Sequence, residues 1–176
     1  MEYIVFFDEG TSHPSLLGGK GANIIKLSQM GLNIPPGFVL NANSYRTFLE
    51  ESENSQQFKE LLTTHLTIKK VLHLTKFIKQ LIRNTEIPQN IIEEIKSGFE
   101  KFKKEAGSNS SFAVRSSATI EDTENFSFAG QAKSYLYNVS FEDLILSIKN
   151  CWSSLYSPSA LYYLIQMNKK GINLSL

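Results

Sequence analysis

The sequence has a single cysteine, Cys151, so no disulfide can form within the chain. It also has no apolar run close to the roughly 20 residues that span a bilayer. At its start, Met1 is followed by Glu2 and Asp8, without the basic and apolar segments of a signal peptide. Together these absences predict a cytoplasmic protein with no membrane partner.

An excess of charge of one sign is also absent. The 18 lysines and arginines, against 17 aspartates and glutamates, give a net charge of +1. No field of the whole molecule therefore attracts nucleic acid or an anionic membrane, and any anion site has to be built locally. The chain does have length and apolar content: 176 residues, 41% of them hydrophobic, suffice for one domain with a hydrophobic core.

Short β-prone runs are separated by glycine, proline and polar turns. The run at 112–114 is apolar throughout and predicts a buried strand. In the last run, Tyr135, Tyr137 and Val139 recur at every second position, which predicts that they share one half-buried face. The expected strands are residues 2–7, 38–40, 112–114 and 133–139.

Apolar residues at helical spacing predict helices between these strands. The first helix follows a glycine-rich turn at 18–21 and ends at Gly31, a typical C-cap residue. The second begins at a polar cap residue, either Asn43 or Ser44. Further helices are expected at 72–82, 91–102 and 141–155, and after Ser157-Pro158.

Residues 52–105 are polar with spaced apolar residues and predict a helical lobe, in which Pro88 occupies the first turn of a helix. Helices mixed with a few short strands place the chain in the α+β class. We expect a small sheet with flanking helices and this additional lobe.

The glycine-rich turn Gly18-Gly19-Lys20-Gly21 precedes a predicted helix. Glycines let the backbone approach an anion, amides at a helix start supply donors, and Lys20 adds a point charge suited to phosphate. The Walker A and dinucleotide-binding patterns both fail on spacing, because Pro14 and Ile24 occupy positions where they require glycine or alanine. A phosphate-binding turn and a plain glycine loop with a solvated lysine both fit.

The segment Arg115-Ser116-Ser117 leaves the strand at 112–114 and is followed by Thr119. A guanidinium group pairs two phosphate oxygens at once, and nearby hydroxyls and loop amides can complete a polyphosphate site. The alternative for Arg115 is an ion pair with Glu121 or Asp122. Those two carboxylates could themselves bind a metal ion or form a turn.

Taken together, the two segments resemble the opening of the nucleotide-binding domain of the phosphoenolpyruvate synthase and pyruvate phosphate dikinase family. The resemblance covers both ends of the chain in order, and residues 52–105 only weakly. It implies an ATP-grasp fold, in which ATP lies between two α+β subdomains, and a related branch phosphorylates rifamycin antibiotics. The matching segments are Leu17–Asn23, Pro35–Phe38, Ala113–Asp122, Ser127–Gln131 and Cys151–Tyr156.

The resemblance implies that Lys20 and Arg115 contact ATP phosphates as catalytic residues. The family passes a phosphoryl group from ATP to a histidine on a separate domain and then to pyruvate. The rest of the ATP-binding shell would come from Gly18, Gly19, Gly21, Ser116, Ser117 and Thr119.

The same resemblance implies that residues 1–176 are one part of an ATP-grasp domain. The second subdomain, the acidic ligands of Mg²⁺ and the phosphohistidine domain are expected beyond Leu176, in cis or in trans. We therefore expect ATP contacts here, no metal ligands, and no complete kinase. Two alternatives are a non-catalytic paralogue acting as a regulatory or interaction module, and the nucleotide-binding part of an antibiotic phosphotransferase.

Overall fold

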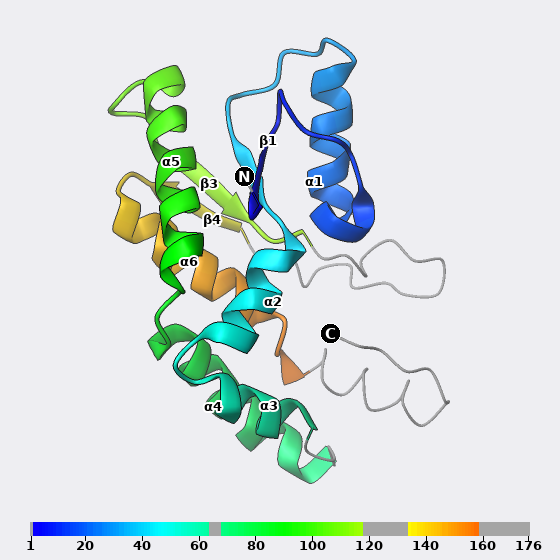
Figure 1. Cartoon of the computed structure of the whole chain (residues 1–176), viewed down its shortest axis with the longest axis vertical. Coiled ribbons are helices and arrows are strands. Elements are labelled where there is room, and N and C mark those ends of the chain that lie inside the picture. The colour runs from blue at the N-terminus through cyan, green and yellow to red at the C-terminus, as the bar shows by residue number, and fades with distance from the viewer. Residues whose placement is uncertain (1, 64–67, 118–133, 159–176) are drawn as a thin grey trace.

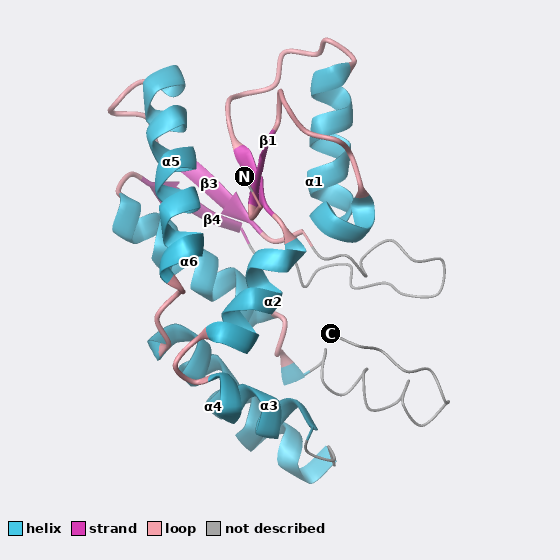
Figure 2. Cartoon of the chain, in the orientation of Figure 1, coloured by secondary structure: helices cyan, strands magenta, loops and turns pink. Residues whose placement is uncertain are grey.

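The computed structural model describes residues 2–63, 68–117 and 134–158 of the chain. Within these residues it contains helices mixed with short strands, which confirms the α+β class (Figures 1 and 2). The strands are β1 (Ile4–Phe6), β2 (Phe38–Leu40), β3 (Phe112–Arg115) and β4 (Ser134–Asn138). The helices are α1 (Pro14–Gln29), α2 (Ala42–Glu51), α3 (Ser55–Thr63), α4 (Ile68–Asn84), α5 (Gln89–Ala106) and α6 (Phe141–Ser154).

The described strands form two separate antiparallel pairs, where the sequence led us to expect one small sheet. Strand β1 pairs with β2, with Val5 opposite Val39, and β3 pairs with β4. Helix α5 lies on one side of the β1–β2 pair and α1 on the other (Figure 1). The β1–β2 pair thereby joins α1 to the rest of the protein.

A bulge interrupts the β3–β4 pair, and it overturns the predicted alternation on β4. Phe112 lies opposite Asn138 and Val114 opposite Tyr135, so between these pairs one residue on β3 faces two on β4. Tyr137 takes a positive φ of 61° within the bulge. Its side chain is 84% exposed, whereas Asn138 is buried. Tyr137 therefore does not share a half-buried face with Tyr135, because the extra residue reverses the side-chain alternation.

The main hydrophobic core is centred on Trp152 of α6. The Phe48 ring of α2 lies 4.8 Å from the Trp152 ring, centroid to centroid, and the Tyr45 ring lies 5.3 Å from it. The Tyr45 hydroxyl also forms a 2.7 Å hydrogen bond with the hydroxyl of buried Tyr156. Residues of the predicted helical lobe complete this core, among them Phe58, Val71, Ile78, Ile82, Ile91 and Ile95.

A second, smaller core lies between α1 and the β1–β2 pair. It consists of Leu17, Ala22 and Ile25, packed against residues that include Val5 and Val39. Gly21 faces β2 so closely that a Cβ atom there would lie 3.1 Å from a methyl carbon of Val39. This packing fixes the first half of α1 against the sheet.

The carboxylate of Glu94, on α5, binds the start of the chain. It accepts hydrogen bonds from the backbone amides of Glu2, Tyr3 and Ile4, at 2.8, 2.9 and 3.2 Å. Partial burial raises the pKa of Glu94, but these three amide donors outweigh it and hold that pKa below its ordinary value. The contact ties β1 to α5.

Two helix ends lie at or next to the residues predicted from local sequence, and one lies elsewhere. Gly31, with a φ of 79°, ends α1 as predicted, and the Leu32 amide donates back to the Leu27 carbonyl. Pro88, predicted in the first turn of a helix, lies one position earlier and directly precedes α5. The cap of α2 was predicted wrongly: it is Asn41, whose side chain accepts from the Ser44 amide.

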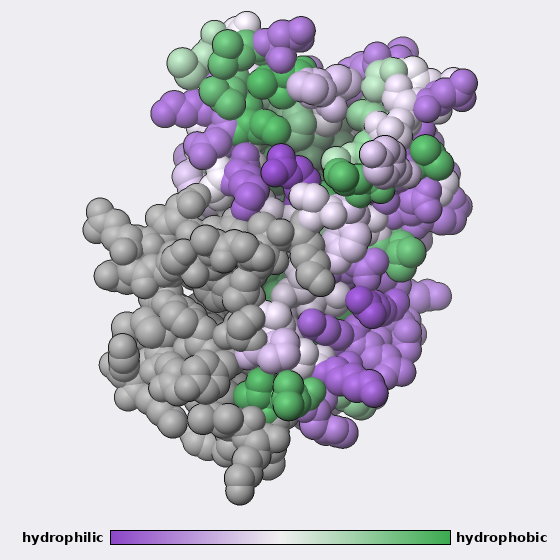
Figure 3. All heavy atoms as spheres, turned by 180° about the vertical axis from the view of Figure 1, so that it is seen from behind, coloured by the Kyte–Doolittle hydropathy of each residue, from purple (hydrophilic) through white to green (hydrophobic). Residues whose placement is uncertain are grey.

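Figure 3 shows the back of the molecule, where hydrophilic residues cover much of the described surface. A hydrophobic group stands out at the end of α1, where Leu27, Met30 and Leu32 are exposed. Among the described helices, none has both the length and the apolar character that a membrane span requires.

Candidate functional site

Helix α1 is broken at Gly18, inside the glycine-rich turn. Gly18 has φ 69° and ψ 166°, far from helical values, while residues on both sides are helical. The turn was predicted to stand directly before a helix, but a helical turn from Pro14 to Leu17 precedes it. Gly18 therefore separates two helical segments, and a new helix start lies at Gly19.

The Ser117 hydroxyl occupies this break. The Gly21 backbone amide donates to the Ser117 Oγ at 3.0 Å, across a separation of 96 residues. The same Oγ donates to the Leu17 backbone carbonyl, also at 3.0 Å. The structure thus brings together two segments that were selected from the sequence as separate candidate sites.

Gly18 permits this close approach. A Cβ atom at Gly18 would lie 2.4 Å from the Ser117 Oγ and 2.5 Å from the Ser117 carbonyl oxygen. Its φ of 69° with ψ of 166° also falls in a backbone region that is essentially restricted to glycine. Any side chain at this position would push the two segments apart.

Two cationic residues lie close to the contact along the chain. Lys20, next to Gly21, is exposed, and Arg115 is exposed at the end of β3, where it pairs with Ser134. Arg115 is two residues from Ser117, on the order of 7 Å along an extended chain. Figure 1 shows the segment that follows β3 running toward the start of α1. Both charges therefore belong to one region of the surface, beside a helix start whose dipole favours anions.

The predicted alternative for Arg115 was an ion pair with Glu121 or Asp122. Those two residues and Thr119 lie outside the described part of the chain. Within residues 2–63, 68–117 and 134–158, the Arg115 guanidinium has no ion-pair partner. The same residues contain no group of three or more side chains able to hold a metal ion.

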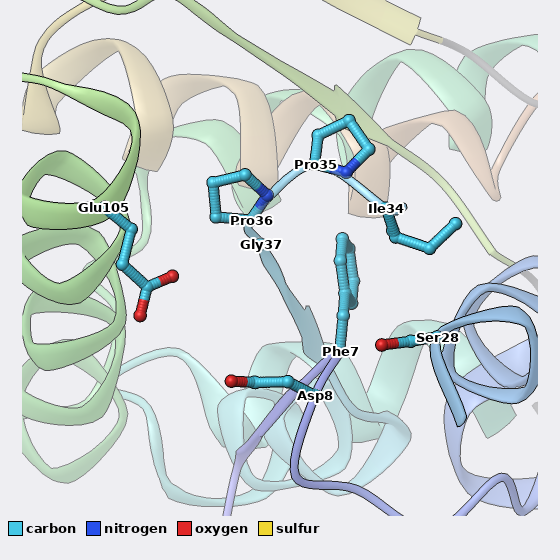
Figure 4. Close-up of a pocket in the computed structure, with 8 residues that line it drawn as sticks. All are labelled: Phe7, Asp8, Ser28, Ile34, Pro35, Pro36, Gly37 and Glu105. Carbon is cyan, nitrogen blue, oxygen red and sulfur yellow. The ribbon is translucent and has the colours of Figure 1, made fainter. Parts of the chain in front are cut away.

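A hollow of about 260 Å³ lies elsewhere, between the β1–α1 loop and the end of α5 (Figure 4). Figure 4 shows the Phe7 ring below the Pro35–Pro36 turn, with the carboxylates of Asp8 and Glu105 on one side. Both carboxylates also lie near the Lys101 ammonium, at 3.6 and 3.9 Å. None of the predicted site residues lines this hollow, so it is separate from the candidate site.

One group of this site, the backbone carbonyl of Leu17, was not predicted from the sequence. A carbonyl group carries no side-chain signature, so no residue type could have revealed it. Gly18 was the signal for the helix break, because a glycine inside a helical pattern weakens the helix there.

Comparison with known protein families identifies the family of this chain. Residues 14–176 of the chain match the family of the pyruvate phosphate dikinase AMP/ATP-binding domain. That match begins at the first residue of α1 and includes both the break at Gly18 and the segment 115–117.

Several curated proteins are similar to this chain. A probable phosphoenolpyruvate synthase of Methanothermobacter thermautotrophicus is 34% identical over 168 residues, which are 93% of this chain and 24% of the relative. One of Staphylothermus marinus is 36% identical, over 92% of this chain and 20% of the relative. The rifampicin phosphotransferase of Bacillus subtilis is 33% identical, over 86% and 17% respectively. The chain spans a quarter or less of the length of these relatives.

Proposed function

Because this chain belongs to the family of the pyruvate phosphate dikinase AMP/ATP-binding domain, we propose that the break in α1 and the end of β3 bind the phosphates of ATP. The observation that carries this proposal is the contact between Gly21 and Ser117. It joins a helix start, with its positive dipole end, to the strand that carries Arg115. A phosphate chain beside this contact would meet two cations and backbone donors.

Lys20 and Arg115 have different parts in this proposal. The Lys20 ammonium is a mobile point charge that neutralises a phosphate oxygen, while the Arg115 guanidinium forms paired hydrogen bonds with two oxygens. Ser116 and Thr119 would supply hydroxyl donors, and Gly18 and Gly19 would let the backbone approach. Gly21 and Ser117 contribute differently, because their polar atoms already bind each other.

The proposed reaction of the whole protein is transfer of a phosphoryl group from ATP to a histidine on another domain. Such transfer depends mainly on positioning and charge neutralisation, which Lys20 and Arg115 would begin. An ATP-grasp second subdomain, the ligands of Mg²⁺ and the acceptor histidine would come from regions outside this chain, in cis or in trans. A cytoplasmic location, predicted from the sequence, fits a role of this kind.

The final acceptor defines two versions of the proposal. The names of the archaeal relatives favour a phosphoenolpyruvate synthase-like protein, with pyruvate as the acceptor. The Bacillus subtilis relative, at 33% identity, favours an antibiotic such as rifampicin. ATP phosphate binding by Lys20 and Arg115 is common to both versions.

Titration calorimetry of the full chain with ATP and Mg²⁺ tests the proposal. We expect measurable binding, and a loss of affinity of roughly tenfold or more for Lys20→Ala and for Arg115→Ala. Lys26→Ala, which removes another exposed charge from α1, and Arg46→Ala, which removes an exposed arginine on α2, are the controls. No binding by the wild-type chain, or equal losses in variants and controls, would instead favour a non-catalytic interaction module.

A further inference from the structure

We propose that Ser117 is a positioning residue: its hydroxyl replaces a missing helical hydrogen bond in α1 and thereby holds Arg115 in place relative to Lys20. This inference rests on the proposed ATP phosphate site. It assigns Ser117 a part that differs from the ligand role predicted from the sequence.

The geometry follows from the hydrogen-bond pattern of an α-helix. In a continuous helix, each backbone amide donates to the carbonyl four residues earlier, so the Gly21 amide would donate to the Leu17 carbonyl. In this protein both groups bind the Ser117 Oγ instead, each at 3.0 Å. Ser117 is thus inserted into that one helical bond, and insertion of a side chain is a known cause of helix kinks.

Burial of the helical residues favours the insertion. Leu17 is 2% exposed, and Gly18 and Gly21 are also buried. Water therefore has little access to the Gly21 amide and the Leu17 carbonyl, and a buried backbone group without a partner is strongly disfavoured. The Ser117 hydroxyl satisfies both groups because it can donate and accept at the same time.

The same arrangement explains why Ser117 does not act as a phosphate ligand. A serine hydroxyl has one proton, and the Ser117 proton is donated to the Leu17 carbonyl. Ionised phosphate oxygens only accept hydrogen bonds, so Ser117 has no donor left for them while the contact persists. Its effect on ATP therefore passes through the two residues beside the contact, Lys20 and Arg115.

The test compares three variants at position 117 with one matched control. Ser117→Ala removes the hydroxyl, Ser117→Thr retains it, and Ser117→Cys keeps a weak donor and acceptor. The control is Ser140→Ala, because the Ser140 Oγ also accepts from a backbone amide, that of Asp143, at 3.0 Å, but at the start of α6. ATP affinity by calorimetry, hydrogen exchange of the Gly21 amide and thermal unfolding are measured for each.

We expect Ser117→Ala to speed exchange of the Gly21 amide and to weaken ATP binding, each by roughly tenfold. Ser117→Thr should keep the exchange rate and the ATP affinity at wild-type values. Ser140→Ala should lower thermal stability without altering the exchange rate or the ATP affinity. If Ser117→Ala does not fold, Ser117→Cys takes its place, with smaller changes in the same directions.

Two results would overturn the inference. If ATP affinity falls while exchange at Gly21 stays at the wild-type rate, Ser117 is a direct ligand. If exchange accelerates while ATP affinity stays unchanged, the contact has no positioning role. A wild-type chain that does not bind ATP contradicts the proposed function instead, and exchange at Gly21 then decides alone whether Ser117 replaces the helical bond.

Discussion

A methyl group on Gly18 would lie 2.4 Å from the Ser117 Oγ. The break in α1 and the end of β3 can meet only because this position carries no side chain. A second glycine, Gly107, has a similar backbone conformation, with φ 96° and ψ 145°, but an added Cβ would approach nothing closer than 3.6 Å. Substitutions at the two glycines therefore distinguish the effect of backbone strain from the effect of losing the contact with Ser117.

Gly18→Ala and Gly107→Ala form a matched pair. Both should lose about 1–3 kcal/mol of unfolding free energy from backbone strain. Gly18→Ala should lose about 1–3 kcal/mol more from overpacking against Ser117, and should also accelerate amide exchange at Gly21. Chemical denaturation and hydrogen exchange measure the two effects. Equal losses in the two variants would show that the contact contributes nothing to stability.

Glu94 makes the start of the chain sensitive to acid. Its pKa is below the ordinary value, so its contribution to stability is present above the unfolded-state pKa, near 4.3, and is lost as the pH falls through the folded-state pKa. We expect Glu94→Gln to be less stable than wild type at pH 7 and to lose less stability on acidification.

Denaturant unfolding between pH 7 and pH 3 checks this prediction. Glu93→Gln is the control, because in the described part of the chain the exposed Glu93 accepts a hydrogen bond from the Gln89 side chain, at 3.2 Å, and none from the start of the chain. The prediction is wrong if Glu94→Gln and Glu93→Gln show the same dependence on pH.

The buried hydroxyl pair of Tyr45 and Tyr156 should show strong energetic coupling. Burial raises the pKa of Tyr156 to about 12. Tyr45→Phe or Tyr156→Phe leaves the other hydroxyl without its partner and should cost about 1–3 kcal/mol. The double variant should cost little more than either single one, because it removes both polar groups.

Equilibrium denaturation of the two single variants and the double variant measures the coupling energy. Tyr137→Phe, at a side chain that is 84% exposed, should leave stability unchanged. Additive losses in the double variant would mean that the 2.7 Å hydrogen bond contributes nothing of its own.

Asn138 stabilises the bulge in β4 through three hydrogen bonds. Its side-chain amide donates to the carbonyls of Phe112 and Tyr135, at 3.2 and 2.8 Å, and its Oδ1 accepts from the Ser147 hydroxyl at 2.6 Å. We expect Asn138→Ala to lower the unfolding free energy by about 2–3 kcal/mol, because buried partners lose their hydrogen bonds.

Thermal unfolding compares Asn138→Ala with Asn138→Asp and Asn109→Ala. The aspartate keeps an acceptor for Ser147 but loses both amide donors, so it should also be destabilising. Asn109 is exposed in the turn after α5, and its replacement should have little effect. A stable Asn138→Asp variant would show that the two carbonyl contacts are dispensable.

Short-range patterns predicted much of the secondary structure. The end of α1 at Gly31 and the start of α5 after Pro88 depend on residues within one turn of the chain, so local sequence was sufficient for them. The cap of α2 was predicted at Asn43 or Ser44 and lies at Asn41. Several polar residues at that point can each act as the helix cap, and only the packing of the helix selects one.

The bulge in β4 was not predictable from alternation. Tyr135, Tyr137 and Val139 have the period of a strand, and the extra residue becomes visible only when β4 is aligned with β3. The buried Asn138 amide then stabilises a register that the tyrosine pattern alone does not favour.

The contact between Gly18 and Ser117 combines residues that are recognisable in the sequence with a hydrogen bond that exists only in the folded chain. The glycines, Lys20 and Arg115 predict phosphate-binding chemistry without any coordinates, because charge and backbone freedom are properties of single residues, and with their flanking motifs they indicate the family. The hydrogen bond from the Gly21 amide to the Ser117 Oγ joins groups 96 residues apart. Only the folded chain places that hydroxyl inside α1, because its position depends on how α1 packs on the β1–β2 pair and how β3 packs against β4 and α6.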